Sequence, residues 1–230
     1  MSVQETARTD VPQVILTRDG RQILNVVDIF PLPAGEVYGN LLSKIAGIHE
    51  RIFEANRQLV QAHQTWERAL QGVDVQRHLF AVEHVTFHLR RAADEMIGLR
   101  AVVSHYEQTG DRPHAVNPDS VGRLLGMGHL CALPVYRDHI ELLRRLNDLH
   151  NAQKHSFLNT DTTMIGRNEP TANAIHRRGN RAAAELVVYG VSLRALVEGF
   201  QSFALSALAE LREISRHIQD RQARNSGDGS

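Results

Sequence analysis

The stretch "LLSKIAGIHERIFEANRQLVQA" (residues 41–62) carries the clearest helical pattern in the sequence. Its apolar residues recur at steps of three and four, which is the period of an amphipathic α-helix. These residues are Leu41, Leu42, Ile45, Ile48, Ile52, Phe53, Leu59 and Ala62. The pattern follows a segment broken by proline and glycine, and it predicts one long helix from about Glu36 to Leu70.

The same period continues along the chain on both sides of several breaks. "TGDRPHAVNPDS" (109–120) is typical of a loop, and Asp119 or Ser120 is a candidate N-cap for the short helix that follows it. Residues 159–181 are polar and irregular, with glycine and proline among them. Helices are expected at about 75–106, at 121–125, from just after Pro134 to about 158, and at 191–220.

The N-terminal segment has a different pattern. "QVILTRDGRQILNVV" (13–27) contains two runs rich in β-branched residues around Asp19-Gly20, which indicates a small hairpin. The chain is therefore expected to be all-α, an antiparallel bundle of about four long helices with a small N-terminal β-hairpin. The expected organisation is an arm and hairpin over 1–35, the helical bundle over 36–222, and a disordered tail over 223–230.

Composition narrows the classes of function. The 230 residues carry 26 Lys plus Arg and 26 Asp plus Glu, so a broad surface for nucleic acid or anionic lipid is not expected. Cys131 is the single cysteine, which leaves no intrachain disulfide and no cysteine-based zinc site. The start "MSVQETARTD" lacks the apolar core of a signal peptide, and no apolar run is long enough for a membrane span. A cytoplasmic protein is expected.

The helix at about 135–158 carries a polar arc opposite its apolar face. At about 100° per residue, one group of polar side chains falls within about 100°. Two asparagines in a helix interior each cost about half a kcal/mol relative to alanine. The arc is therefore either a solvated face or a set of side chains that hydrogen-bond across an interface. Its members are Arg144, Asn147, Asp148, Asn151 and His155, with Lys154 at the border, whereas His150 falls at the margin of the apolar face near Leu143.

The helix expected at 75–106 carries a second polar line, formed by His84, His88, Arg91 and Glu95. Two histidines four residues apart can bind one metal ion from one helix face. Arg91 lies in the same line and disfavours a cation there. The line is expected to be solvated or to form interhelical hydrogen bonds, so no metal and no cofactor is expected, and a metal-dependent helical-bundle enzyme is an alternative.

At "LNDLHNAQKHSF" (146–157) the sequence resembles the HEPN superfamily, which are helical-bundle proteins of prokaryotic defence and toxin–antitoxin systems. The signature of that family is an arginine, often followed by a polar residue, and a histidine after a gap of four to six residues. The segments "FHLRRAADEMIGL" (87–99) and "SLRALVEGFQSFALSALAEL" (192–211) are similar in style. The resemblance covers about residues 75–215 in architecture.

The register of the motif decides what the resemblance implies. When "HNAQKH" is aligned with the family pattern, His150 stands where the family has arginine, while Asn151 and His155 match. Two other registers use Arg145 or Arg144 with His150, but Arg145 is followed by Leu146 rather than by a polar residue. The chain therefore fits the general spacing of an arginine and a histidine in the family signature, but in each register it departs from the more specific form of that signature.

The resemblance implies metal-independent RNA cleavage in a cleft between two protomers. Histidine supplies a base of near-neutral pKa for such chemistry, and arginine or lysine supplies donors to the phosphoryl oxygens. The catalytic residues that it implies are His155, Asn151, His150 and Arg145. The residues that it implies for phosphate or RNA binding are Arg144, Lys154, Asn147 and Asp148.

Because the diagnostic arginine is replaced, the function expected first is a catalytically weak or silent HEPN-like module for dimerisation or partner binding. The alternative is an active, metal-independent HEPN endoribonuclease. The resemblance implies a homodimer, with RNA or a protein antitoxin as a possible partner and no membrane.

Overall fold

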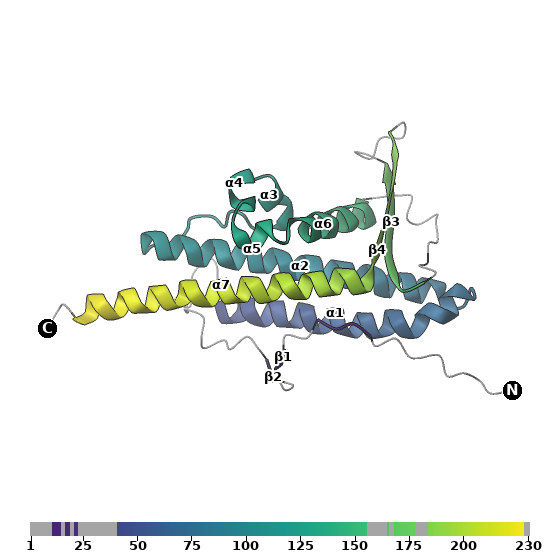
Figure 1. Cartoon of the computed structure of the whole chain (residues 1–230), viewed down its shortest axis with the longest axis horizontal. Helices are drawn as coiled ribbons and strands as arrows, with labels where there is room; N and C mark the ends of the chain where they lie inside the picture. Colours follow the sequence, from purple (N-terminus) through teal and green to yellow (C-terminus); the bar gives the residue numbers. More distant parts are fainter. Residues whose placement is uncertain are drawn as a thin grey trace.

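The computed structural model describes residues 11–14, 17–18, 21–22, 41–155, 165, 168–177 and 184–227. Three long helices run side by side along the molecule: α1 (Leu41–Leu70), α2 (Val75–Thr109) and α7 (Leu193–Gly227) (Figure 1). The shorter helix α6 (Ile140–His155) lies along α2 (Figure 1). No helix in the described part of the chain is long and apolar enough to cross a bilayer.

The direction of each long helix follows from its contacts. α1 runs antiparallel to α2, since Arg51 pairs with Glu95 near one end and the Ala62 carbonyl accepts a hydrogen bond from His78 near the other. α7 runs parallel to α2, because Arg100 donates two hydrogen bonds to Glu210 at 2.8 and 2.7 Å and His217 pairs with Glu107 at 3.0 Å. The long helices are therefore not all antiparallel neighbours.

The sequence predicted these helices from their periodicity. α2 begins at the expected residue and ends at Thr109, just before the C-cap Gly110, whose φ of 77° is a left-handed conformation that glycine adopts without strain. α3 (Val121–Leu125) is confirmed, and Ser120 rather than Asp119 caps it by accepting a hydrogen bond from the Arg123 N–H. α7 extends further than expected, to Gly227 rather than about Asp220.

Two other expectations for the chain were wrong. The helix expected from Pro134 onward is broken into α5 (Pro134–Arg137) and α6, after a further short helix α4 (Gly128–Cys131). The polar segment expected to be irregular contains β3 (Thr171–Arg177), which pairs antiparallel with β4 (Leu186–Ser192). This hairpin projects from the helical body (Figure 1) and packs mainly on α6.

The N-terminal segment is described only in part. β1 (Thr17–Arg18) and β2 (Arg21–Gln22) form a pairing of two residues each, and the rest of the expected hairpin lies outside the described residues. Asn56 on α1 holds the arm by accepting from the Val14 N–H at 2.7 Å and donating to the Val14 carbonyl at 2.9 Å.

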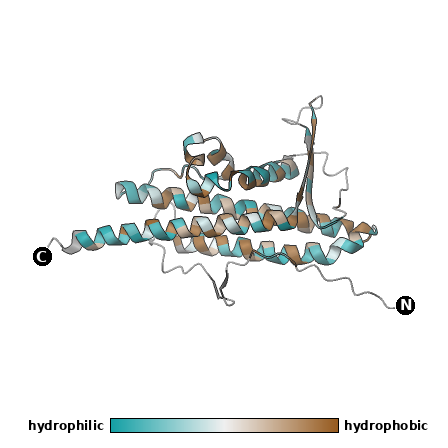
Figure 2. Ribbon diagram, in the orientation of Figure 1, coloured by the Kyte–Doolittle hydropathy of each residue, from teal (hydrophilic) through white to brown (hydrophobic). Residues whose placement is uncertain are grey.

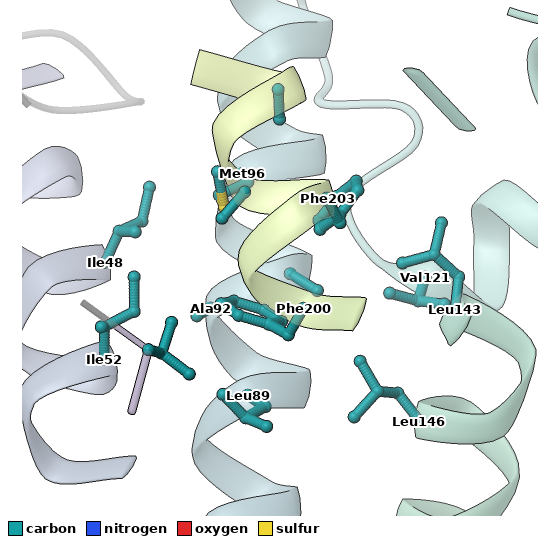
Figure 3. Close-up of a cluster of buried hydrophobic side chains, with 14 of the residues drawn as sticks. Ile48, Ile52, Leu89, Ala92, Met96, Val121, Leu143, Leu146, Phe200 and Phe203 are labelled. Atoms are coloured by element: carbon teal, nitrogen blue, oxygen red, sulfur yellow. The ribbon is translucent and has the colours of Figure 1, made fainter. Parts of the chain in front are cut away.

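The hydrophobic core surrounds α2, which α1, α6 and α7 contact from different sides. Figure 2 shows apolar residues gathered between the long helices, whereas the C-terminal end of α7 is hydrophilic. The close-up in Figure 3 shows side chains from each of these helices and from α3 pointing toward one another. They include Ile48, Ile52, Leu89, Met96, Val121, Leu143, Leu146, Phe200 and Phe203, all buried.

Candidate functional site

The expected polar arc on α6 divides into an exposed part and a half-buried part. Arg144, Asn151 and Lys154 are exposed, while Asn147 and Asp148 are half-buried. Arg144 donates to Glu141 one turn earlier at 2.8 Å. The side chain of His155, the expected catalytic base, lies outside the described residues. The arc is therefore not one solvated face.

Asn147 contacts α2 across the helix interface. Its Oδ1 accepts a hydrogen bond from Arg90 Nη2 at 3.2 Å. Asparagine at this position of the helix thus has a structural role, because its side-chain oxygen accepts a hydrogen bond from a buried arginine on the neighbouring helix. The backbone of Gly122 also lies against this oxygen, because a Cβ added there would be 3.4 Å from it.

Arg90 belongs to a buried cluster that the sequence did not reveal. We call it the Arg90 cluster: Arg90, Asp94, Asn147 and the backbone N–H of Val121. Arg90 and Asp94 are only 6% and 7% exposed, and they form an ion pair one turn apart on α2. Asp94 Oδ1 also accepts from the Val121 N–H at 2.7 Å, at the first residue of α3. The cluster joins α2, α3 and α6.

The charge of Arg90 is maintained in spite of its burial. Desolvation, with a further contribution from Arg91, lowers the pKa of Arg90 to about 10, so the side chain remains protonated at neutral pH. Its Nε is buried without a hydrogen-bond partner among the described residues. A buried charge of this kind depends on its carboxylate partner, because an unpaired charge in the interior is strongly destabilising.

His150 and Arg145, the other two expected catalytic residues, lie apart from this cluster. Arg145 is exposed. His150 is half-buried, as expected, and its ring centroid lies 5.9 Å from that of Phe87 on α2. Phe87 is in turn 36% exposed and packs edge-on against His88 at 5.1 Å. His150 therefore lies beside an aromatic surface of α2.

That surface is a strip along the N-terminal half of α2. We call it the α2 strip: Phe80, Glu83, His84, Phe87 and Arg91, which are all exposed and lie along one face of the helix. Phe80 is 58% exposed. The described chain shows no ion pair or side-chain hydrogen bond for Glu83, and the two ion pairs of Arg91, to Asp94 and Glu95, are long at 3.9 Å.

A cavity of about 270 Å³ lies where the α2 strip ends. Arg91, Asp94 and Glu95 line it from α2, and Leu41 and Lys44 line it from the start of α1. Leu99, Val102 and Val116 give it an apolar wall. The cavity thus combines apolar surface with charges of both signs.

The histidines on α1 and α2 do not form a metal site in the described part of the chain, where no three His, Cys, Asp or Glu side chains are placed to hold an ion. His84 and His88 instead pack edge-on at 6.4 Å. Burial lowers the pKa of His88, with the positive charges of Arg51, His84 and Arg57 adding to this effect and Glu54 opposing it.

Cys131 is half-buried against the hydrophobic core and donates a hydrogen bond to the Leu124 carbonyl at 3.2 Å.

No family model, curated protein or solved structure matches the chain.

Proposed function

We propose that this chain is a HEPN-like helical module that binds a partner protein and does not cleave RNA. The observation that carries the proposal is the position of His150, which stands where the family has its diagnostic arginine. His150 packs beside Phe87 instead of presenting a permanently charged guanidinium to a cleft. Cleavage chemistry depends on such a cation to stabilise the phosphoryl oxygens.

The other polar residues of the motif support the same proposal. The oxygen of Asn147 accepts a hydrogen bond from the buried Arg90, and Arg144 bonds to Glu141 on its own helix. The contact of Asn147 with a buried side chain gives it a structural role, and Arg144 is paired on the surface of its own helix. Partner binding is supported by the α2 strip, because exposed aromatic side chains flanked by charges are typical of protein interfaces.

In this proposal the helical bundle is a scaffold of a prokaryotic defence or toxin–antitoxin type. The chain's equal numbers of basic and acidic residues fit a protein partner better than an extended RNA. The expected four-helix architecture, with its N-terminal hairpin as an added contact, belongs to this proposal.

The test is an RNA cleavage assay with the purified full-length chain and labelled single-stranded RNA in the presence of EDTA. We expect no cleavage above a buffer control, and the same result for His155→Ala. Cleavage by the unmodified chain that persists in EDTA and disappears in His155→Ala would contradict the proposal and favour an active ribonuclease.

A further inference from the structure

The cavity between α1, α2 and the loop before α3 has the features of a small-molecule site. One face of α2 forms its length, from Arg91 to Val102, which is about 16 Å along the helix. Its volume of about 270 Å³ is close to the lower end of the range for ligand pockets, which favours a small ligand. The other sides are formed by Leu41 and Lys44 on α1 and by Val116 and Asp119 in the loop.

Gly98 on α2 lets the loop approach the cavity closely. A Cβ at this position would lie 3.5 Å from Val116 Cγ1 and 3.9 Å from the Cα of Asp119, which are ordinary van der Waals distances. The loop therefore lies directly over the Gly98 backbone. This approach places an apolar residue and an acidic residue side by side in one wall of the cavity.

Two carboxylates of the cavity have capacity for a further hydrogen-bond donor. Glu95 forms ion pairs with Arg51 at 3.6 Å and with Arg91 at 3.9 Å, and both are longer than a hydrogen bond. Asp119 accepts from the neighbouring serine hydroxyl at 3.1 Å and pairs with Arg123 at 3.6 Å. An ionised carboxylate can accept about four hydrogen bonds, so both groups can accept from the ammonium group of a ligand.

Lys44 supplies the opposite charge. It is exposed in the first turn of α1 and forms no ion pair or side-chain hydrogen bond in the described part of the chain. Gly47 of α1 lies against Glu95, since a Cβ there would be 3.3 Å from Glu95 Oε2. Because α1 is antiparallel to α2, Lys44 lies just under one turn further toward the apolar wall. Its ammonium group can therefore bind a carboxylate next to Glu95.

We propose that this cavity binds a free α-amino acid with an apolar side chain, of about the size of leucine. Glu95 and Asp119 accept hydrogen bonds from its α-ammonium group, Lys44 binds its α-carboxylate, and its side chain packs against the apolar wall. Leucine is about half as large again as benzene, which a cavity of about 150 Å³ admits, so it fits the volume. This ligand is additional to the partner protein of the proposed function and does not depend on it.

Asp94 connects the cavity to the rest of the chain. It lines the cavity, pairs with Arg90 and accepts from the Val121 N–H at 2.7 Å. One wall of the cavity is therefore part of the Arg90 cluster, which joins α2, α3 and α6. A ligand that fills the cavity stabilises the folded chain, because the unfolded chain lacks the site.

The first experiment is isothermal titration calorimetry of the full-length chain with L-leucine, for which we expect a dissociation constant below about 1 mM. Isocaproate is leucine without its ammonium group, and isoamylamine is leucine without its carboxylate. We expect each analogue to bind at least about tenfold more weakly, because a charge of the cavity then lacks its partner. Glycine, which has no side chain for the apolar wall, should bind more weakly than leucine by a similar factor.

The second experiment assigns the two charges. We expect Lys44→Met to weaken the binding of leucine at least about tenfold without weakening that of isoamylamine. Glu95→Gln should weaken leucine to the same extent without weakening isocaproate. Arg216→Met and Glu213→Gln, which alter exposed residues of α7, are the matched controls and leave binding unchanged. Circular dichroism of each variant establishes that it folds.

A third measurement does not depend on altered charges. Val116→Phe adds a ring to the apolar wall at a half-buried position, and we expect it to abolish leucine binding. In the unmodified chain, leucine at ten times its dissociation constant should raise the thermal midpoint by about 3 °C or more.

A chain that binds none of leucine, isoleucine, valine and methionine at about 10 mM overturns the proposal. Isocaproate or isoamylamine that binds as well as leucine also overturns it, because the site would then recognise an apolar acid or amine. Leucine binding that is unchanged by Lys44→Met, Glu95→Gln and Val116→Phe places the ligand elsewhere and overturns the assignment of the cavity.

Discussion

Two regions of α2, only a few residues apart, invert the usual distribution of residue types. The Arg90 cluster places a cation and a carboxylate in the interior, and the α2 strip places two phenylalanines in solvent. The buried charges hold α3 and α6 to α2, so their energetic role lies within the chain. Phe80 is 58% exposed and Phe87 is 36% exposed, so part of each ring remains open to a binding partner. Charged residues are usually exposed and aromatic residues are usually buried. The buried charges of α2 therefore indicate residues that stabilise the fold, and its exposed aromatic residues indicate a binding surface.

The largest effect should come from Asp94→Ala. It removes the acceptor of both the Arg90 guanidinium and the Val121 N–H, and it leaves a buried charge unpaired. Breaking such a pair destabilises proteins by about 3–5 kcal/mol, so we expect the free energy of unfolding to fall by about 3 kcal/mol or more. Urea denaturation measures it, with Asp220→Ala on the exposed face of α7 as the control. A loss under about 1 kcal/mol would mean that Arg90 relaxes into solvent.

Asn147→Ala should have the next largest effect. It removes the acceptor of Arg90 Nη2, and hydrogen bonds to charged groups contribute about 1.5–3 kcal/mol when buried. Because Asn147 is half-buried, we expect a loss of about 1–2 kcal/mol. Asn151→Ala, one turn further along α6 and exposed, is the matched control and should change stability by no more than about 0.5 kcal/mol. Equal effects of the two substitutions would remove the distinction between the halves of the polar arc.

Acid should weaken the fold through His78, another buried polar group of α2. Its Nδ1 donates to the Ala62 carbonyl at 3.0 Å, while its Nε2 is buried without a partner in the described structure. Burial lowers the pKa of His78, and the hydrogen bond to Ala62 opposes this change. The unfolded chain therefore binds the proton more readily than the folded one. This stabilisation is present above the unfolded pKa of about 6.5 and is lost as pH falls from there toward the lower folded value.

His63 adds to this effect, because burial lowers its pKa and the positive charges of Arg194 and His78 act in the same direction, with Glu169 opposing them. We expect the thermal midpoint to fall between about pH 7 and pH 5, and His78→Gln, whose amide can still donate to Ala62, to reduce that slope. An unchanged slope in His78→Gln would assign the acid sensitivity to other groups.

The smallest effect on folding should come from Phe80→Ser in the α2 strip. Most of this side chain is already in water, so its removal should change the free energy of unfolding of the monomer by about 0.5 kcal/mol or less. The unfolding of a dilute, monomeric sample measures this effect. A loss of about 2 kcal/mol would show that Phe80 is part of the core rather than a binding surface.

The sequence predicted the helices well because their stabilisation follows a local period. Ile45, Ile48 and Ile52 repeat at the spacing of one helix face, and all three are buried. The β3–β4 hairpin was missed because its stabilisation is not local. Ala172 and Ala174 are small residues that are buried through tertiary packing, in a segment whose composition is typical of a loop.

The candidate site was predictable in part. The two asparagines of α6 suggested hydrogen bonds across an interface, and Asn147 makes one. Its partner was missed, although Arg90 and Asp94 lie one turn apart among Leu89, Ala92 and Ala93 in a pattern that places them on a buried face. The α2 strip could not be predicted, because only the positions of α1, α3 and α6 determine which phenylalanines of α2 remain uncovered.

The parallel arrangement of α2 and α7 has a consequence for how the chain reaches this structure. The residues that these helices bring together, such as Arg100 and Glu210, are 110 positions apart. Phe200 and Phe203 on α7 are fully buried beside α2 and α6, so the interior stays open until the last long helix has been made. Contacts of such long range slow folding. Because α7 follows β3 and β4 in the chain, the apolar faces that Phe200 and Phe203 cover are completed only after α7 has been synthesised.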